Sequence, residues 1–300
     1  MSRRKSLLNA ANSGNLNVLS NDSLFVNPRK VSVKELTGIQ GLGRSSHHII
    51  ITDPADKADK IINTVSGDYG LLPNEVFIPA IENRLNAAEI KFQRRVISRE
   101  NARFAVDYIL ADDNYHINVK NNRDIIKPMF RVVNSYDGSS NTEGHFGFFR
   151  QVCSNGLHVA KTQMEFAVRH RGAIVEIVMP KIEDLIVAFM SNEFYSLHEK
   201  FKVLSESPIE DLNGFVKYTL GETGLFKYSK SEKNPDAPSV GAQFILNTIN
   251  KESVAIGTKP NLWLGYNAFN EYIHTQNEKV FMLQERADRK IFDTILAQVN

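Results

Sequence analysis

The chain has 300 residues, of which 42% are hydrophobic and 23% are charged, and its formal net charge is +2. This length and composition allow a sizeable hydrophobic core and exclude a largely disordered polar chain. So small a net charge excludes nucleic-acid binding driven by the overall charge of the protein. Binding to nucleic acid would need a local patch of Lys and Arg. The single cysteine, Cys153, excludes an internal disulfide framework.

The chain shows no predicted targeting or membrane-spanning segment. The apolar run near its start is too short for a signal peptide, and nowhere do about 18 apolar residues follow one another. We therefore expect a soluble cytoplasmic protein with no membrane partner.

Residues 1–46 are predicted to form a basic, flexible arm. They are rich in Ser, Asn and Gly, and their apolar residues follow no period. Seven basic residues stand against two acidic ones, Asp22 and Glu35. Two interpretations remain open: a frayed terminus, or an arm that contacts DNA or a neighbouring subunit.

The segment after the arm is predicted to hold one strand and two short helices. His47–Thr52 is apolar enough for a short buried strand, and Asp53-Pro54 is typical of a helix start. We expect that helix to continue to Val65. A second helix is expected over residues 76–86, with Pro79 near its start.

Between about residues 89 and 160 the apolar pattern has a period of two, which predicts β-strands. The connections are short and polar, and they predict an antiparallel meander because parallel crossovers need a dozen or more residues. The strands are expected at 91–98, 103–110, 129–136 and 146–153, with an edge strand at 166–171.

Beyond residue 178 the pattern becomes helical. Pro180 fits a first helical turn, and further helices are expected at 209–220, 240–251, 261–275 and 279–298. The sequence therefore predicts an α+β fold, an antiparallel β-meander backed by helices with a helical C-terminal half. We expect a sheet region at 47–178 and a helical region at 179–300, packed together as one compact domain.

Basic residues in the meander are the strongest functional signal. A sheet that exposes Lys and Arg can follow a phosphate backbone, and interleaved aromatic residues such as Phe92 and Tyr108 can stack bases. Alternation places Arg94 and Arg95 on opposite faces, so only some of these residues can share one surface. The alternative is an ordinary solvated sheet face. The predicted nucleic-acid-binding residues are Lys91, Arg94, Arg95, Arg99, Arg103, Arg131 and Arg150.

The sequence predicts no catalytic residue, metal site or cofactor. Cys153 lies in an apolar strand, which favours a small core residue over a nucleophile. Asp68 with Glu89 and Lys91 has the spacing of a metal-dependent nuclease, and we keep that function as an alternative. A second alternative is a non-enzymatic interaction or virion-associated protein.

Three short motifs occur in order along the chain. The stretch from Asn134 to Gly138 predicts a turn in which Asn and Asp side chains satisfy local backbone groups and glycine takes a positive φ. Asn155-Gly156 predicts a sharp strand exit. Trp263–Tyr272 predicts a helix with Trp263 in the core and Asn267 bonded to sheet backbone. The motif residues are Asn134, Asp137, Gly138, Cys153, Asn155, Gly156, Trp263, Asn267, Glu271 and Tyr272.

This ordered set resembles the phage- and plasmid-borne domain of unknown function family 932, over roughly residues 60–298. The resemblance implies a protein of phage or plasmid DNA metabolism in the host-cell cytoplasm, with no established reaction. Its expected architecture is similar to that of phage proteins that anneal complementary strands. We therefore expect a homo-oligomer that binds single-stranded DNA and takes part in recombination by strand annealing.

Overall fold

The computed structural model describes residues 24–40, 46–53, 55–99, 102–111, 117–119, 124–150, 156–157, 165–189, 193–276 and 281–299. The chain divides into two compact units. Unit 1 comprises Met1–Asn114, Met129–Phe146 and Lys161–Met190, and unit 2 comprises Tyr115–Pro128, Gly147–Ala160 and Ser191–Asn300. Strands β7 (Asp124–Ser135) and β8 (Thr142–Arg150) each contribute residues to both units.

A small antiparallel sheet in unit 1 has the order β1 (Arg29–Ser32), β2 (His47–Thr52) and β3 (Asp59–Val65). The strand predicted at His47–Thr52 is confirmed. Within the predicted arm, β1 pairs with β2, and Ser32 then caps the short helix α2 (Val33–Thr37) through a capping box with Glu35. The remaining arm residues, 1–23 and 41–45, lie outside the described part of the chain.

The helix predicted from Asp53 to Val65 is wrong, because this stretch forms a turn followed by β3. The Asp53 carboxylate accepts a hydrogen bond from the Ala55 amide at 2.8 Å and pairs with Lys60. Lys57 has a φ of 59°, which helical residues do not adopt. The turn returns the chain to β2, and the residues with apolar spacing form a strand in which Val65 is buried and Ile61 is exposed.

The larger sheet has the order β10-β8-β7-β5-β4, with β6 paired to β7 and β9 paired to β8. The pairs β4–β5, β5–β7 and β8–β10 are antiparallel, so the predicted meander is confirmed, as is a strand near the predicted edge position. The other strands are β4 (Phe92–Arg99), β5 (Arg103–Leu110), β6 (Ile117–Val119), β9 (Gly156–Leu157) and β10 (Glu165–Val168).

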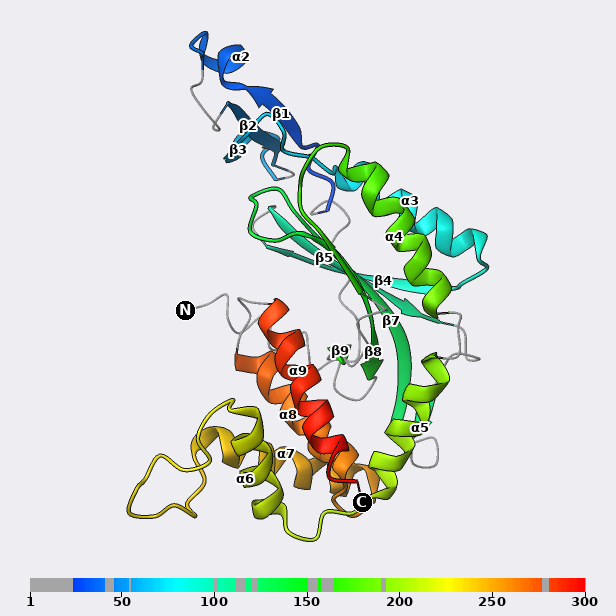
Figure 1. Ribbon diagram of the computed structural model, residues 1–300, viewed down its shortest axis with the longest axis vertical. Coiled ribbons are helices and arrows are strands. Elements are labelled where there is room, and N and C mark those ends of the chain that lie inside the picture. Colours follow the sequence, from blue (N-terminus) through cyan, green and yellow to red (C-terminus); the bar gives the residue numbers. More distant parts are fainter. Residues whose placement is uncertain are drawn as a thin grey trace. The chain divides into compact units, whose positions relative to one another are not determined.

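Helices α3 (Asn74–Ala87) and α4 (Ile174–Phe189) lie side by side over one face of the unit 1 sheet (Figure 1). We call this the helix face, and its strand residues include Phe104, Tyr108 and Phe130. Pro180 lies inside α4, so the prediction that it begins this helix is wrong. The apolar residues from Ile174 onward already pack on the sheet, and the helix tolerates one missing N–H.

Unit 2 gathers the remaining helices, and Figure 1 shows α6, α7, α8 and α9 packed together. Asp211 and Ser239 cap the starts of α6 and α7, and glycines in the left-handed region end both. The helices predicted at 209–220, 240–251, 261–275 and 279–298 are confirmed. They are α6 (Leu212–Thr223), α7 (Val240–Ile256), α8 (Leu262–Gln276) and α9 (Phe281–Leu296), and α5 (Glu193–Glu206) precedes them.

The fold is therefore α+β, with antiparallel sheets and with most of its helices in the C-terminal half. Within the described ranges, none of the helices has the length and apolar character needed to cross a membrane.

Candidate functional site

A cluster of two arginines and one aspartate lies on the unit 1 sheet, on the face opposite α3 and α4. Arg95, Asp107 and Arg131 are direct cross-strand neighbours on β4, β5 and β7. The Arg131 Nε–Asp107 Oδ1 distance is 2.5 Å, and the Arg95 Nη2–Asp107 Oδ2 distance is 2.6 Å. One carboxylate therefore holds two guanidiniums, and the cluster carries one net positive charge. We call this side of the sheet the charged face.

Burial sets the electrostatics of this cluster. Burial alone would raise the pKa of Asp107, but the charges and hydrogen bonds of Arg131 and Arg95 outweigh it and hold the pKa far below its usual range. Asp107 therefore stays ionised. The side chain of Arg131 is only 3% exposed, whereas that of Arg95 is 18% exposed. Arg95 is the member of the cluster that reaches solvent.

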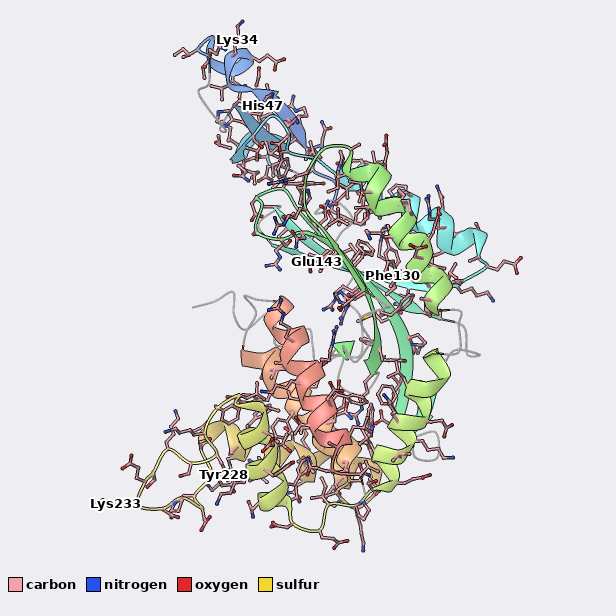
Figure 2. The ribbon with its side chains drawn as sticks, in the orientation of Figure 1. Lys34, His47, Phe130, Glu143, Tyr228 and Lys233 are labelled. Carbon is pink, nitrogen blue, oxygen red and sulfur yellow. The ribbon has the colours of Figure 1, made fainter. Side chains whose placement is uncertain are left out.

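The row of charged residues continues across the sheet. Phe130 contacts Phe146, and Asn134 contacts Thr142. Both contacts give the same register between the antiparallel strands β7 and β8, and this register places Arg131 opposite His145. His145 is in turn opposite Glu165 on β10. Glu143 adds a further buried carboxylate on β8. Glu143 belongs to the charged face and Phe130 to the helix face, and both are labelled in Figure 2.

Basic residues also follow the outer strand, β4. Lys91 immediately precedes this strand, is exposed, and shares its alternation with Arg95. Near the other end, Arg99 is directly opposite Arg103 in the ladder. We call Lys91, Arg95 and Arg103, which alternation and register place on the charged face, the β4 rim.

Two of the predicted nucleic-acid-binding residues lie elsewhere. Arg94 is on the helix face, where its Nη1 lies 2.7 Å from Oε1 of Glu82 on α3. Arg150 belongs to unit 2 and is fully buried. The structure therefore brings together Arg95 and Arg131 and places Lys91 and Arg103 on the same face. It separates Arg94 and Arg150 from this surface, and the side chain of Arg99 lies outside the described residues.

Arg150 forms a second charged cluster, with the opposite stoichiometry. Its Nε donates to both oxygens of Asp124 at 2.8 Å, and its Nη1 donates to both oxygens of Glu252 at 2.9 and 2.8 Å. The Trp263 indole N–H donates to Asp124 at 2.8 Å, and the guanidinium lies 5.8 Å from the centre of the same indole ring. Two carboxylates therefore share one buried arginine.

The second carboxylate of this cluster is difficult to ionise. Burial raises the pKa of Glu252, the Arg150 charge opposes this, and the nearby Asp124 and Glu271 carboxylates raise it further. The cluster joins residues from β7, β8, α7 and α8. It links Arg150, which precedes the Asn155-Gly156 motif in the sequence, with Trp263 of the Trp263–Tyr272 motif. Both side chains are buried and stabilise the fold.

The first motif is a structural turn, as predicted, with one difference. Asp137 Oδ1 accepts from the Ser139 amide at 2.8 Å, and Gly138 has a φ of 72°. Asn134, however, does not bond local backbone. Its amide donates to Leu72 O at 2.8 Å and to Asn74 Oδ1 at 2.9 Å, so it fastens β7 to the start of α3.

The third motif places Trp263 in the core, at 1% exposure, as predicted. The predicted bond from Asn267 to sheet backbone is wrong, because its amide donates to Trp263 O one turn earlier in the same helix. Tyr272 packs against Phe226 with ring centres 4.8 Å apart. Gly156 of β9 pairs with Phe149 of β8. Cys153 and Asn155 lie outside the described residues.

The nuclease alternative gains no support from geometry. The Asp68 carboxylate accepts a hydrogen bond from the hydroxyl of Ser66, and Glu89 has a φ of 57° at the end of the turn before β4. Across the parts of the chain that the structure describes, no three His, Cys, Asp or Glu side chains gather as a metal would require.

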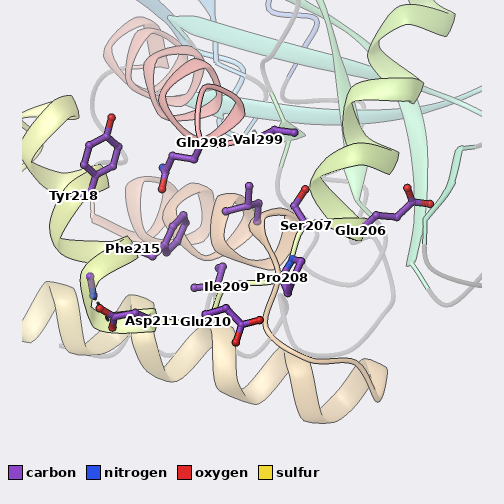
Figure 3. Close-up of a pocket in the computed structure, with 12 residues that line it drawn as sticks. Glu206, Ser207, Pro208, Ile209, Glu210, Asp211, Phe215, Tyr218, Gln298 and Val299 are labelled. Carbon is purple, nitrogen blue, oxygen red and sulfur yellow. Dashed lines mark hydrogen bonds between the residues drawn. The ribbon is translucent and has the colours of Figure 1, made fainter.

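A groove of about 540 Å³ opens in unit 2 between the α5–α6 connection and the ends of α6 and α9 (Figure 3). Glu206, Glu210 and Asp211 line it, and no Lys or Arg does. The Asp211 carboxylate also accepts from the Gly214 amide at 3.0 Å, which caps α6. This acidic groove would repel a phosphate backbone and does not fit a nucleic-acid site.

Sequence reasoning missed the carboxylates that organise both clusters, namely Asp107, Asp124 and Glu252. A signal existed for Asp107, since it is the one acid in an otherwise apolar strand and shares its face with Arg95. The Asp124–Trp263 and Arg150–Glu252 bonds span 139 and 102 residues, and no local pattern predicts them.

A family model described as a domain of unknown function (DUF932) matches residues 61–294, which is most of the chain. No curated protein and no solved structure matches the chain.

Proposed function

The chain belongs to the DUF932 family of domains of unknown function, and we propose that it binds single-stranded nucleic acid through the phosphate backbone, along the β4 rim. The observation that carries the proposal is the unequal cluster on the charged face, in which Arg95 and Arg131 share the single carboxylate of Asp107. The partly exposed Arg95 guanidinium lies on an outer strand that Lys91 also precedes on the same face.

The geometry favours a chain of phosphate groups over a single small anion as the ligand. Asp107 fixes the Arg95 guanidinium with two hydrogen bonds, at 2.9 and 2.6 Å, while part of the side chain stays in solvent. A guanidinium held in this way loses little rotamer freedom when it binds phosphate. The β4 rim repeats basic residues along the strand, and this repetition suits a chain of phosphates.

The wider assignment rests on the sequence resemblance. We include in the proposal a role in phage or plasmid DNA metabolism in the host cytoplasm, with assembly of several copies and strand annealing as the associated activity.

The test compares neighbouring arginines that face opposite ways. In the first variant, Lys91→Ala and Arg95→Ala are combined; in the matched control, Arg94→Ala removes a guanidinium paired to Glu82 on the helix face. Fluorescence anisotropy with labelled single strands, duplex and RNA over a range of salt concentrations gives the affinity and the salt slope. We expect the double variant to lower the slope by roughly one unit or less per residue, and the control to leave it unchanged.

Two results would overturn the proposal. One is the absence of salt-dependent binding of the intact protein to any single strand. The other is an equal loss of affinity in the Arg94→Ala control, since a general loss of folded protein would then explain both variants. Circular dichroism of each variant shows whether it is folded.

A further inference from the structure

The groove of unit 2 has an apolar lining that the fold holds in place. Ile209, Phe215 and the half-exposed Tyr218 all contribute to this lining (Figure 3). The α5–α6 connection is tied to the segment before α8, since the Ile209 amide donates a hydrogen bond to Pro260 O at 3.0 Å. Phe215 packs so closely on α8 that a side chain at Gly265 would meet its ring at 2.5 Å. A ligand in the groove would therefore meet apolar surface that is already positioned.

Three carboxylates line the same groove. Glu206 is the last residue of α5, and Glu210 and Asp211 lie in the connection to α6 (Figure 3). Asp211 already has a structural role, because its side chain accepts a hydrogen bond from the Gly214 amide and caps α6. Glu206 and Glu210 are exposed, and neither forms an ion pair within the described part of the chain. The groove therefore offers two carboxylates, beside apolar surface, to a cationic ligand.

The chain itself contains a segment of complementary composition. Residues 3–8 hold three adjacent cations followed, after one serine, by two leucines, and no acidic residue precedes Asp22. We call residues 3–8 the basic segment. Between it and Leu24, the first described residue, residues 9–23 can span up to about 50 Å when extended. This reach allows the basic segment of one copy to bind a neighbouring copy.

We infer that the groove of one copy binds the basic segment of a neighbouring copy. Charge complementarity carries the inference, since the segment gathers three cations and the groove is lined by three carboxylates. The apolar lining gives the two leucines a surface to cover. A groove and a segment are different surfaces, so the contact is heterologous and repeats from copy to copy into a ring or a filament. The inference deepens the assembly included in the proposed function and does not require nucleic-acid binding.

The experiment measures self-association of the full chain by sedimentation velocity, without nucleic acid, in two complementary variants. The segment variant carries Arg3→Ser, Arg4→Ser and Lys5→Ser. The groove variant carries Glu206→Gln and Glu210→Gln. Each variant alone should associate at least about fivefold more weakly than the parent, because charge pairs across the contact are lost. Mixed in equal amounts, the two variants should form a 1:1 complex, since each supplies the half of the contact that the other lacks.

The matched control is Glu222→Gln with Glu232→Gln, which removes the same charge from exposed carboxylates outside the groove lining. We expect this control to associate like the parent. Raising the salt concentration from about 0.05 M to about 0.5 M should weaken association of the parent, because salt screens exposed charges. Leu7→Ser with Leu8→Ser keeps the charge of the basic segment and should weaken association at both salt concentrations. Circular dichroism shows whether each variant is folded.

Three results would overturn the inference. One is a parent protein that stays monomeric at every concentration measured. Another is a groove variant that associates as strongly as the parent, which would place the contact elsewhere on the surface. The third is a mixture of the two variants that stays monomeric, as it would if the basic segment bound within its own copy. None of these results concerns the affinity of the β4 rim for single strands, so the inference and the proposed binding function can fail separately.

Discussion

The two buried charge clusters use the same side-chain chemistry in opposite proportions. In unit 1, two arginines share Asp107, and one of them reaches solvent. In unit 2, Asp124 and Glu252 share Arg150, whose side chain is 0% exposed. The comparison separates two uses of a buried ion pair. Under the proposed function, the partly exposed Arg95 serves a ligand, whereas the enclosed Arg150 serves the fold.

The largest effect is expected from Arg150→Met, which leaves two carboxylates in the core of unit 2 without their cation. Breaking a buried pair in this way costs about 3–5 kcal/mol in the free energy of unfolding, measured by urea denaturation. Arg29→Ala is the control, because its pair with Asp59 is largely solvent-exposed and should contribute far less to the free energy of unfolding. Equal costs for the two variants would show that the Arg150 cluster is not desolvated.

A smaller loss is expected from Asp107→Asn in unit 1. The amide keeps one hydrogen-bond acceptor for the guanidiniums, and Arg95 can turn its charge to solvent. We expect a cost of about 1–3 kcal/mol, below that of Arg150→Met. Should Asp107→Asn prove the more destabilising of the two, the proposed contrast between a ligand-facing and an enclosed cluster fails.

The smallest effect is a change in pH dependence in Glu252→Gln. Burial raises the pKa of Glu252 above its ordinary value of 4.5, so the folded protein retains a proton that the unfolded chain has already released. The free energy of unfolding therefore falls as pH rises through this range, by up to about 1.4 kcal/mol per unit of raised pKa. The Gln variant should lack this fall, which begins as pH rises above about 4.5.

Asp107 gives the opposite sign. Its pKa is lowered, so its contribution is present above its ordinary value of 3.8 and is lost as pH falls through its folded-state pKa. Urea denaturation of the parent, Glu252→Gln and Asp107→Asn at several pH values tests both predicted pH dependences of the free energy of unfolding. A parent-minus-variant difference that stays constant with pH for Glu252→Gln would contradict the raised pKa.

Alternation along the strands was enough to predict the meander, and it also placed Arg94 and Arg95 on opposite faces. It failed between Asp53 and Val65, because apolar residues spaced for a helix also fit a twisted strand after a tight turn. The start of α4 is not predictable from Pro180, because proline favours the first helical turn and yet here lies inside a helix that begins at Ile174.

The candidate site was predictable only in part. Basic composition pointed to the meander, but alternation cannot show that Arg150 lies enclosed by Glu252 from a helix 102 residues away. Carboxylates that bind arginines across such separations decide which cations remain for a ligand. Their positions follow from tertiary packing rather than from any local pattern.

Trp263 is the one tryptophan of the chain, and it lies against Arg150 and Asp124 in unit 2. Its fluorescence therefore reports on that unit, while circular dichroism records helices and strands of both. Coincident unfolding curves from the two signals would mean that the whole chain melts in one cooperative step. Separate curves would mean that the strands shared between the units do not couple their melting.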